Sequence, residues 1–504
     1  MLRFNVSKRI FTLLLCLAVT AAAFCLPTLS VSAAEDAVTV PRIVITTAGG
    51  NGTALQKDDI WRDASITITG TDGSILSNSC VMKVRGNTTA LSWVTKKSYS
   101  FKFDKKRDVL GMGKGKKWAL NANVFDPTLL RNYTAFAFAK ELGLAYTSEV
   151  QFVELWLDGV FCGCYLLEEP VQQGKDRVDI DVESNDGKQD FLLEYEKSRV
   201  EDDEVYLTTN SLRFIISEPE NATEEQQDYI KKTMQTIFYY IRYGTRAQIE
   251  EVVDVDSFAK FYLLNEYMKT YDLDMSSVYF YYKDGKLYAG PPWDYDMSMG
   301  NSSPDFPTTV AKEAHKSDGV FAADKTIFRY ICQNKWFFDE VKRVYRDHFD
   351  FMQHIAADGG LLDAALAQYG EVFDRNYGEA GWSAKKWWIN YQLKPQDTYE
   401  GNFNFLKTWG QERAAWMEQY YDPFDVMFLC GDADGDGEVT ISDVTMVQRC
   451  LAELVPADEA LLQRADVTGG GLTVDDATAI QRYLAEFDGE YGIGTKVRKE
   501  NPAS

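Results

Sequence analysis

An acidic loop near the C-terminus constrains the fold of this 504-residue chain more than any other feature. Residues 432–443 read Asp-Ala-Asp-Gly-Asp-Gly-Glu-Val-Thr-Ile-Ser-Asp, with a glycine at loop position six, where the chain must turn sharply. Calcium needs several hard oxygen ligands at short range, and this spacing wraps them around one ion. An acidic turn without a metal is the alternative. The predicted ligands are Asp432, Asp434, Asp436, Glu438 through its carbonyl, Thr440 and Asp443.

The segment that follows this loop occurs twice. Residues 444–453 (Val-Thr-Met-Val-Gln-Arg-Cys-Leu-Ala-Glu) are echoed by residues 477–486 (Ala-Thr-Ala-Ile-Gln-Arg-Tyr-Leu-Ala-Glu), both with apolar residues at helical spacing. A duplicated loop and helix, with Asp at loop position twelve, resembles a type I dockerin over residues 430–488. The resemblance implies a small all-α, EF-hand-like module that binds Ca²⁺ and a cohesin module of a scaffoldin. Residues 489–504 would then form a C-terminal tail.

The second loop departs from the calcium pattern. It offers Asp466, Thr468 and Asp476, but Gly470 stands where an Asp ligand is expected, and the loop is one residue short before Leu472. Fewer charged ligands weaken calcium affinity, so we expect only a weak second site.

The N-terminus has the organisation of a secretory signal. A basic stretch comes first, an apolar run over residues 10–26 follows, and small residues at 31–34 offer a cleavage point. We therefore expect residues 1–33 to be removed and the protein to be secreted, free or held at the cell surface by a scaffoldin. An uncleaved membrane anchor is the alternative, which the short apolar run disfavours. No later run is long enough to span a membrane.

Charge and composition narrow the function classes. The formal net charge is −23, from 76 acidic and 53 basic residues, which argues against nucleic acid or an anionic membrane as partner. Only three histidines occur, so zinc chemistry and a Ser-His-Asp triad are poor candidates. Two of the eight cysteines precede the expected cleavage point, and the remainder are too sparse for a disulfide framework. Cys430 and Cys450 could form a disulfide, which the sequence does not decide.

Residues 41–423 form the bulk of the expected mature chain. Short alternating strands, such as residues 97–103 and 151–167, mix with helical runs at 225–243 and 257–270. The pattern lacks a regular βαβ repeat, which indicates an α+β module.

This module carries a series of short motifs between residues 80 and 300. In chain order they are Val-Arg-Gly-Asn-Thr-Thr (84–89), Lys-Lys-Ser-Tyr-Ser-Phe-Lys-Phe (96–103), Leu-Gly-Met-Gly (110–113), Lys-Trp-Ala-Leu-Asn-Ala-Asn (117–123), Asp-Pro-Thr-Leu-Leu-Arg-Asn (126–132), Cys-Tyr-Leu-Leu-Glu-Glu (164–169), Lys-Asp-Gly-Lys-Leu (283–287) and Gly-Pro-Pro-Trp-Asp-Tyr-Asp-Met-Ser-Met-Gly (290–300). The series resembles the CotH kinase family. The resemblance implies an atypical protein kinase-like fold that binds ATP with Mg²⁺ and phosphorylates a protein acceptor.

Three aspartates are the candidate catalytic and metal-binding groups. Asp294 and Asp296 are two residues apart, and in an extended segment both would point to one side and could hold Mg²⁺. Turn carboxylates that cap the next segment are the alternative. Asp272 falls where the family carries its catalytic-loop aspartate, which orients the attacking hydroxyl, and Asp274 is a nearby competitor. Ordinary loop carboxylates without a catalytic role are the alternative for both.

Three basic residues are candidates for contacts with the phosphates of ATP. Arg85, in an Arg-Gly-Asn segment, could present its guanidinium to phosphates. Lys97 or Lys102 could be the strand lysine that pairs the phosphates, with Glu169 as its carboxylate partner. A solvated face is the alternative for each lysine.

Two further features allow a structural or a functional interpretation. Arg131, close to Asp126, is expected to make a structural ion pair. The aromatic runs at 336–338 and 387–388 could stack on sugar rings if exposed, but burial between helices is the commoner arrangement.

The sequence thus predicts a secreted, scaffold-docked phosphotransferase or its inactive relative. ATP is scarce outside cells, so the resemblance supports the fold better than the reaction. One alternative is a non-catalytic binding or structural subunit, such as a pseudokinase or adhesin. Another is a glycoside hydrolase of polysaccharide catabolism, which would need two carboxylates across a sugar cleft. No glycosidase signature is evident.

Overall fold

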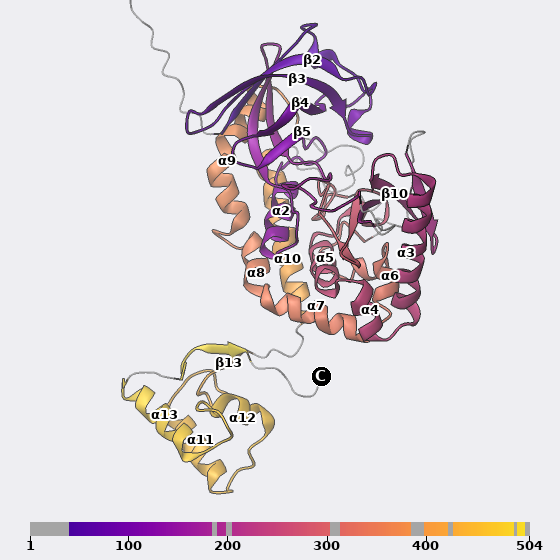
Figure 1. Cartoon of the computed structure of the whole chain (residues 1–504). Helices are drawn as coiled ribbons and strands as arrows, with labels where there is room; N and C mark the ends of the chain where they lie inside the picture. Colours follow the sequence, from indigo (N-terminus) through magenta and orange to yellow (C-terminus); the bar gives the residue numbers. More distant parts are fainter. Residues whose placement is uncertain are drawn as a thin grey trace, which may run out of the picture.

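The computed structural model describes residues 40–183, 189–197, 204–302, 313–384, 398–421, 427–487 and 491–498. The expected signal segment, residues 1–33, lies outside these ranges, as do Trp387 and Trp388. The described part mixes helices and strands, in agreement with an α+β class (Figure 1). None of its helices combines the length and the apolar character needed to cross a membrane.

The N-terminal part of the large module is a closed β-barrel. Its strands follow the order β1-β2-β3-β4-β5-β7-β6 around the barrel. All neighbours pair antiparallel except β1 and β6, whose parallel pairing closes the barrel. The strands are β1 (Arg42–Thr47), β2 (Arg62–Thr69), β3 (Ile75–Arg85), β4 (Ser98–Asp108), β5 (Lys114–Asn121), β6 (Val150–Leu157) and β7 (Val160–Glu168).

Alternation along these strands fills the barrel with apolar side chains. Met82 and Val84 of β3 point inward with Phe101 and Phe103 of β4 and Trp118 of β5. Because successive strand residues point to opposite faces, Lys83, Arg85 and Lys102 lie on the outer face of the same strands.

The second part of the module joins a five-stranded sheet to a group of helices. The sheet has the order β12-β11-β8-β10-β9, and all its pairs are antiparallel. Its strands are β8 (Phe191–Tyr195), β9 (Tyr206–Thr209), β10 (Leu212–Glu218), β11 (Val278–Lys283) and β12 (Lys286–Ala289). The helices are α2 (Arg131–Glu141), α3 (Glu224–Tyr243), α4 (Arg246–Val252), α5 (Val255–Met268), α6 (Phe328–Ile331), α7 (Lys335–Asp347), α8 (Phe349–Ala356), α9 (Leu361–Gly378) and α10 (Tyr399–Tyr421).

Two of these helices form where the sequence predicts them, for identifiable reasons. The side chain of Thr223 caps α3 in a capping box with Gln226, and the apolar stripe from Ile230 to Ile241 is buried. Helix α5 is buried on nearly all sides, which suits its high apolar content. The aromatic run at 336–338 lies on α7, where Phe337 is buried and its neighbours pack against the core.

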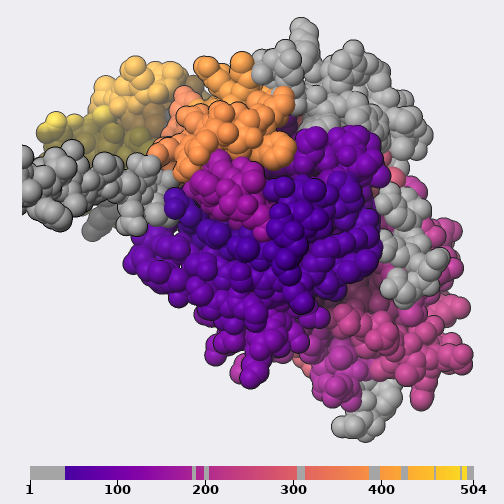
Figure 2. Space-filling model, turned by 90° about the horizontal axis from the view of Figure 1, so that it is seen from above, coloured from indigo at the N-terminus to yellow at the C-terminus, as the bar shows by residue number. Residues whose placement is uncertain are grey.

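The barrel and the late helices contact each other directly. The Asn376 side chain of α9 accepts a hydrogen bond from the backbone N–H of Cys164 on β7 at 3.1 Å, and Arg375 pairs with Glu154 of β6. Figure 2 shows the barrel residues in indigo and purple, with the orange residues of the late helices beside them.

The C-terminal residues have an apolar core of their own, built around Val444, Val447 and Ile480. It contains α11 (Ile441–Leu451), α12 (Glu459–Ala465) and α13 (Val474–Leu484). Strand β13 (Met427–Leu429) pairs antiparallel with β14 (Lys496–Arg498), so part of the expected tail returns to the start of this module. Cys430 and Cys450 are free thiols.

Candidate functional site

A cavity of about 440 Å³ is lined by four of the charged residues that the sequence singled out: Arg85, Asp272, Asp294 and Asp296. One wall comes from the barrel: Lys83 and Arg85 of β3, the segment 86–89 that follows, and Lys117 of β5. The other wall comes from β8, β11, the segment 293–297 and the 3₁₀ turn η3 (Tyr271–Asp274). The cavity thus has a cationic wall facing an acidic wall.

Three aspartates converge on the acidic wall. One carboxylate oxygen from each of Asp272, Asp294 and Asp296 lies within 4.8 Å of the other two. Asp296 is buried, whereas Asp272 and Asp294 are half-buried in the cavity wall. Such a group of like charges is stabilised when a cation binds between its oxygens, and hard oxygen donors suit Mg²⁺. The sequence therefore found all three members of this cluster.

The electrostatics of the triad reflect this crowding. Loss of water contact raises the pKa of Asp272 and Asp296 well above the ordinary range, and the charge of Asp294 raises both pKa values further. Desolvation also raises the pKa of Asp294, while Arg85 and a hydrogen bond with Ser277 oppose that rise. The neighbouring residues thus supply too little positive charge to balance the three aspartates.

Residues 293–300, which we call the metal loop after the cation that Asp294 and Asp296 could hold, bring both carboxylates to one point. Tyr295 lies between them and points into the core, where its hydroxyl bonds Asn265 at 3.2 Å and its N–H donates to Asn132 at 2.7 Å. Asp294 has a positive φ of 63°, so the segment is not a regular strand. The expected alternation of side chains is nevertheless present.

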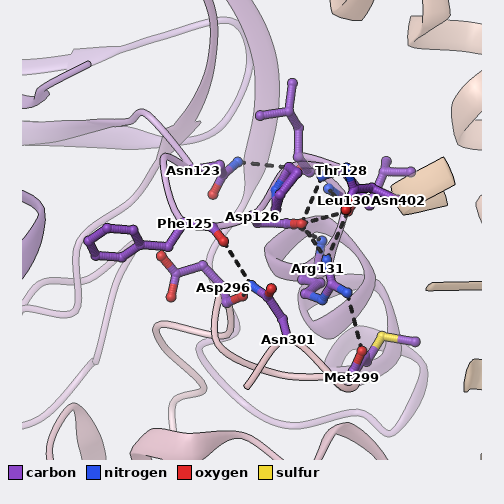
Figure 3. A network of polar contacts seen from close by, with 12 residues as sticks. Asn123, Phe125, Asp126, Thr128, Leu130, Arg131, Asp296, Met299, Asn301 and Asn402 are labelled. Carbon is purple, nitrogen blue, oxygen red and sulfur yellow. Dashed lines mark hydrogen bonds and ion pairs between the residues drawn. The ribbon is translucent and has the colours of Figure 1, made fainter. Parts of the chain in front are cut away.

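A buried polar network fixes this metal loop to the start of α2 (Figure 3). The Arg131 guanidinium pairs with Asp126 at 2.5 Å and donates to the carbonyl oxygens of Ser298 at 2.8 Å and Met299 at 3.2 Å. The Arg131 and Asp126 side chains are no more than 2% exposed. The expected ion pair therefore exists, and it also holds the loop that carries Asp296.

A second tie in the same network is the Asn301 side chain. Its Nδ2 donates to the carbonyl oxygen of Asp296 at 2.7 Å and to that of Phe125 at 2.8 Å. Figure 3 shows Asn301 between these two groups. The position of Asp296 is thus set by contacts with the residues that precede α2.

Asp272 and Asp274 have different surroundings, although they are two residues apart. Asp274 accepts hydrogen bonds from the side chain of Arg329 at 2.5 Å and from the N–H of Thr326 at 2.8 Å, and it pairs with Lys197 at 3.0 Å. Its carboxylate is therefore occupied by structural contacts, whereas that of Asp272 faces the cavity.

The cationic wall contains Arg85 and three lysines that the sequence did not single out: Lys57, Lys83 and Lys117. Arg85 lies over the ring of Trp293 at 5.1 Å, next to the metal loop. Lys83 pairs with Asp59 at 2.8 Å. Desolvation, together with the charges of Arg85 and Lys83, lowers the pKa of Lys117. The period-two alternation from Arg85 would have identified Lys83, but Lys117 becomes a neighbour only through the pairing of β4 with β5.

The lysines proposed from sequence lie elsewhere. The Lys97 ammonium donates to the carbonyl oxygens of Ala90 at 3.1 Å and Leu91 at 2.5 Å, so it braces the loop after β3. Lys102 lines a neighbouring cavity. Neither pairs with Glu169, whose partner is Arg177.

Glu168, the residue before Glu169, is the carboxylate that lies near the cavity, where the charges of Arg85 and Asp294 act on it. Glu168 is buried and bonds the Asn121 side chain at 3.0 Å. Burial raises the pKa of Glu168 to about 7, and the nearby charge of Arg85 opposes that rise. Because adjacent strand residues face opposite ways, Glu169 points toward Arg177 instead. A similar acid, Glu194 of β8, accepts a hydrogen bond from Tyr279 at 2.9 Å and lines the cavity.

The first C-terminal loop has the geometry of a cation site. Asp432, Asp434 and Asp436 each bring an oxygen within 4.8 Å of the others. Asp432 accepts backbone hydrogen bonds from Gly435 at 2.8 Å and Gly437 at 3.0 Å, which curls the loop around its carboxylate.

The end of the same loop is fixed to the helix that follows. Asp443 is buried and accepts hydrogen bonds from the backbone N–H groups of Thr440 at 2.6 Å and Asp434 at 3.1 Å. The Thr440 side chain in turn caps α11. The backbone N–H of Glu438 donates to Asp436 at 2.9 Å, which holds this part of the loop against the aspartate carboxylates. This all-oxygen donor set fits Ca²⁺.

The second loop has hydrogen bonds similar to those of the first loop but fewer carboxylates. Asp476 is buried and accepts hydrogen bonds from Thr473 at 2.7 Å and from the Thr468 hydroxyl at 2.8 Å, and Asp466 accepts one from Gly471 at 2.9 Å. Asp476 thus occupies the place that Asp443 has in the first loop. Thr468 takes the position of Asp434, so this loop offers less negative charge to a cation.

Two family models match the chain. The model described as CotH kinase protein matches residues 82–417, and the type I dockerin domain model matches residues 430–485. No curated protein matches the chain. Type I dockerin domains bind Ca²⁺, and this match implies a cohesin partner and docking to a cellulosome-type scaffold. Strands β1 and β2 precede the first matched segment yet are part of the closed barrel.

Proposed function

From the premise that the chain belongs to the CotH kinase protein family, we propose that residues 41–423 form an atypical protein kinase-like module that transfers a phosphoryl group from ATP to a protein acceptor. One observation carries the proposal: three aspartates converge in a cavity whose opposite wall is cationic. Phosphoryl transfer requires just such a division, with carboxylates for the metal and cations for the phosphates.

The metal role falls to the loop aspartates. Asp294 and Asp296 would hold Mg²⁺, because both present carboxylate oxygens at one point and the network at Arg131 keeps their loop in place. When bound, Mg²⁺ neutralises charge on the phosphates and orients them.

Asp272 is proposed as the residue that orients the acceptor. Its carboxylate would accept the proton of a serine or threonine hydroxyl as the hydroxyl oxygen forms a bond to the γ-phosphorus. The bond between that phosphorus and the bridging oxygen breaks, and ADP leaves with the electron pair. Asp274, already engaged by Arg329 and Lys197, cannot take this part without giving up those contacts.

The phosphate contacts are assigned to the cationic wall. Arg85, which lies over Trp293 beside the metal loop, and Lys117 line the same cavity as the loop aspartates. Lys83 and Arg85 are close enough to Lys117 for their charges to act on it. Lys117 takes over the phosphate-pairing role that the sequence gave to Lys97 or Lys102, because the former braces a loop and the latter lines another cavity.

The C-terminal module is proposed to place this activity in an extracellular complex. Residues 1–33 would direct secretion, and the module at residues 430–488 would bind a cohesin when Ca²⁺ occupies the loop that starts at Asp432. Its calcium-dependent docking would bring the large module close to the other proteins on the scaffold.

Thermal unfolding with and without Mg²⁺-ATP tests the nucleotide site. A ligand that binds only the folded state raises the unfolding midpoint. We expect Mg²⁺-ATP to raise the midpoint of the large module, and Asp294→Asn to remove that effect. If millimolar Mg²⁺-ATP leaves the wild-type midpoint unchanged, the proposal fails. The non-catalytic subunit and the glycoside hydrolase would then be the remaining candidates, and release of reducing sugars from plant polysaccharides separates them.

A further inference from the structure

A second cavity, of about 460 Å³, adjoins the metal cavity. The two share Lys83, Lys117, Glu194 and Tyr279 in their walls. The second cavity is therefore continuous with the proposed phosphate site through the same pair of lysines.

Four lysines line this second cavity: Lys83, Lys102, Lys116 and Lys117. We call the surface they form the lysine groove. Lys102 and Lys117 are direct cross-strand partners in the β4–β5 register, an arrangement in which like charges destabilise a sheet. Such a concentration of positive charge is unexpected in a chain whose net charge is −23.

Within the described part of the chain, most of these lysines have no carboxylate paired directly with them. Among the residues that the structure describes, no carboxylate forms an ion pair with Lys102, Lys116 or Lys117, and only Lys83 has one, with the exposed Asp59. Three glutamates also line the cavity, and the charge of one of them, Glu220, acts on Lys117. The ring of Trp61 lies 5.4 Å from the Lys83 ammonium and 5.8 Å from that of Lys102. An anionic ligand would remove the repulsion between these lysines.

We propose that the lysine groove binds an acidic polypeptide segment, and that this segment is the part of the phosphoacceptor next to the reacting hydroxyl. That this segment accepts the phosphoryl group rests on the proposed phosphoryl transfer, whereas its binding to the lysine groove does not. Acidic residues of the segment contact the lysines while a neighbouring serine or threonine reaches Asp272.

The arrangement favours a peptide over the nucleotide as occupant. Arg85 and the two shared lysines, with Mg²⁺ when it is bound, would supply the charge that a triphosphate needs. Lys116 is exposed and Lys102 half-exposed at the rim, where they can reach a ligand outside the cavity. A nucleobase would need a free aromatic or apolar face. The Trp61 ring is covered by the Lys83 and Lys102 ammonium groups, and the Tyr279 hydroxyl donates to Glu194.

The opposite rim limits the path of the peptide. It carries Glu218 and Glu220, and Glu218 accepts a hydrogen bond from the backbone N–H of Gln173 at 3.2 Å. An acidic segment must therefore run along the β4–β5 side. This division of charge favours an extended chain with carboxylates on one side over a uniformly charged polymer.

Fluorescence anisotropy with the full-length protein tests the proposal. The probe is a fluorescein-labelled peptide of glutamates around one serine, with a lysine peptide as the comparison. We expect only the glutamate peptide to bind at low salt, and Lys102→Glu/Lys116→Glu to weaken it at least about tenfold through lost attraction and new repulsion. The matched control is Lys231→Glu/Lys232→Glu on α3, which changes the net charge equally and lines neither cavity.

Four results would overturn the proposal. The glutamate peptide could fail to bind, or it could bind the groove variant as tightly as the control variant. The groove variant could also lose the midpoint shift with Mg²⁺-ATP, which would assign the groove to the nucleotide. If polygalacturonate binds the groove and the peptide does not, the occupant is a polysaccharide and the proposal is again wrong. Peptide binding without any ATP effect in the wild-type protein would refute only the phosphoryl transfer.

Discussion

Replacement of Arg131 by lysine should loosen the metal loop without removing a charge. The guanidinium contacts three groups at once: the Asp126 carboxylate and the carbonyl oxygens of Ser298 and Met299. A lysine can keep the contact with Asp126, but it lacks the fork that reaches both carbonyl oxygens. Arg131→Lys therefore tests the anchoring of the loop alone, because it does not leave the Asp126 carboxylate buried without a partner.

The magnitude follows from the two lost hydrogen bonds. A hydrogen bond from a charged donor contributes about 1.5–3 kcal/mol, and a carbonyl oxygen left buried without a partner adds to the cost. We therefore expect Arg131→Lys to lower the free energy of unfolding of the large module by about 3–6 kcal/mol. The matched control is Arg343→Lys on α7, whose ion pairs are about half exposed and should contribute less than about 1 kcal/mol.

Urea unfolding followed by tryptophan fluorescence measures this difference in the full-length protein. All 11 tryptophans precede residue 417, so the signal reports on the large module alone. The loosened loop should also reduce the midpoint shift that Mg²⁺-ATP produces at a fixed Mg²⁺ concentration. Equal urea midpoints for Arg131→Lys and Arg343→Lys would refute the anchoring role of the network.

Three other outcomes follow from the same contacts. Asp294→Asn should raise the stability of the nucleotide-free protein by about 0.5–2 kcal/mol, because it removes one of three crowded charges, while it abolishes the ATP effect; a urea midpoint below wild type would contradict this. Asp432→Ala, or chelation of Ca²⁺, should abolish cohesin binding in surface plasmon resonance and leave the tryptophan-detected transition unchanged, whereas a shift in that transition would show that the two modules are coupled. Asp274→Asn should destabilise the large module by about 1–3 kcal/mol through lost contacts with Arg329 and Lys197, but Asp272→Asn should not, and the reverse order in urea would exchange their roles.

The parts of the site that were predictable from sequence are those encoded by short spacing. The first calcium loop is contiguous, so each ligand position from Asp432 to Asp443 can be counted along the chain. The pair Asp294 and Asp296 is equally local, and alternation around Tyr295 brings both to one point. Asp272 was identified through the family resemblance, because nothing in its own neighbourhood separates it from Asp274.

The cationic wall depends on pairings that the sequence does not reveal. Lys117 reaches the cavity because β5 pairs with β4 in a particular register, and a shift by one residue would turn it away. The same one-residue alternation decides that Glu168, and not Glu169, lies on the side of Arg85. The barrel itself closes through a parallel pairing of β1 and β6, whose residues are far apart in the chain.

Transfer of radiolabel from [γ-³²P]ATP to protein tests the central claim most directly. The full-length protein is incubated with Mg²⁺ and an acidic, serine-containing protein such as casein, with Asp272→Asn and Asp294→Asn variants in parallel. We expect Mg²⁺-dependent label on the acceptor or on the enzyme itself with the wild type, and none with either variant. Label that persists at the wild-type rate in both variants, or no label where Mg²⁺-ATP binding is established, would contradict the assignment of this cavity to phosphoryl transfer.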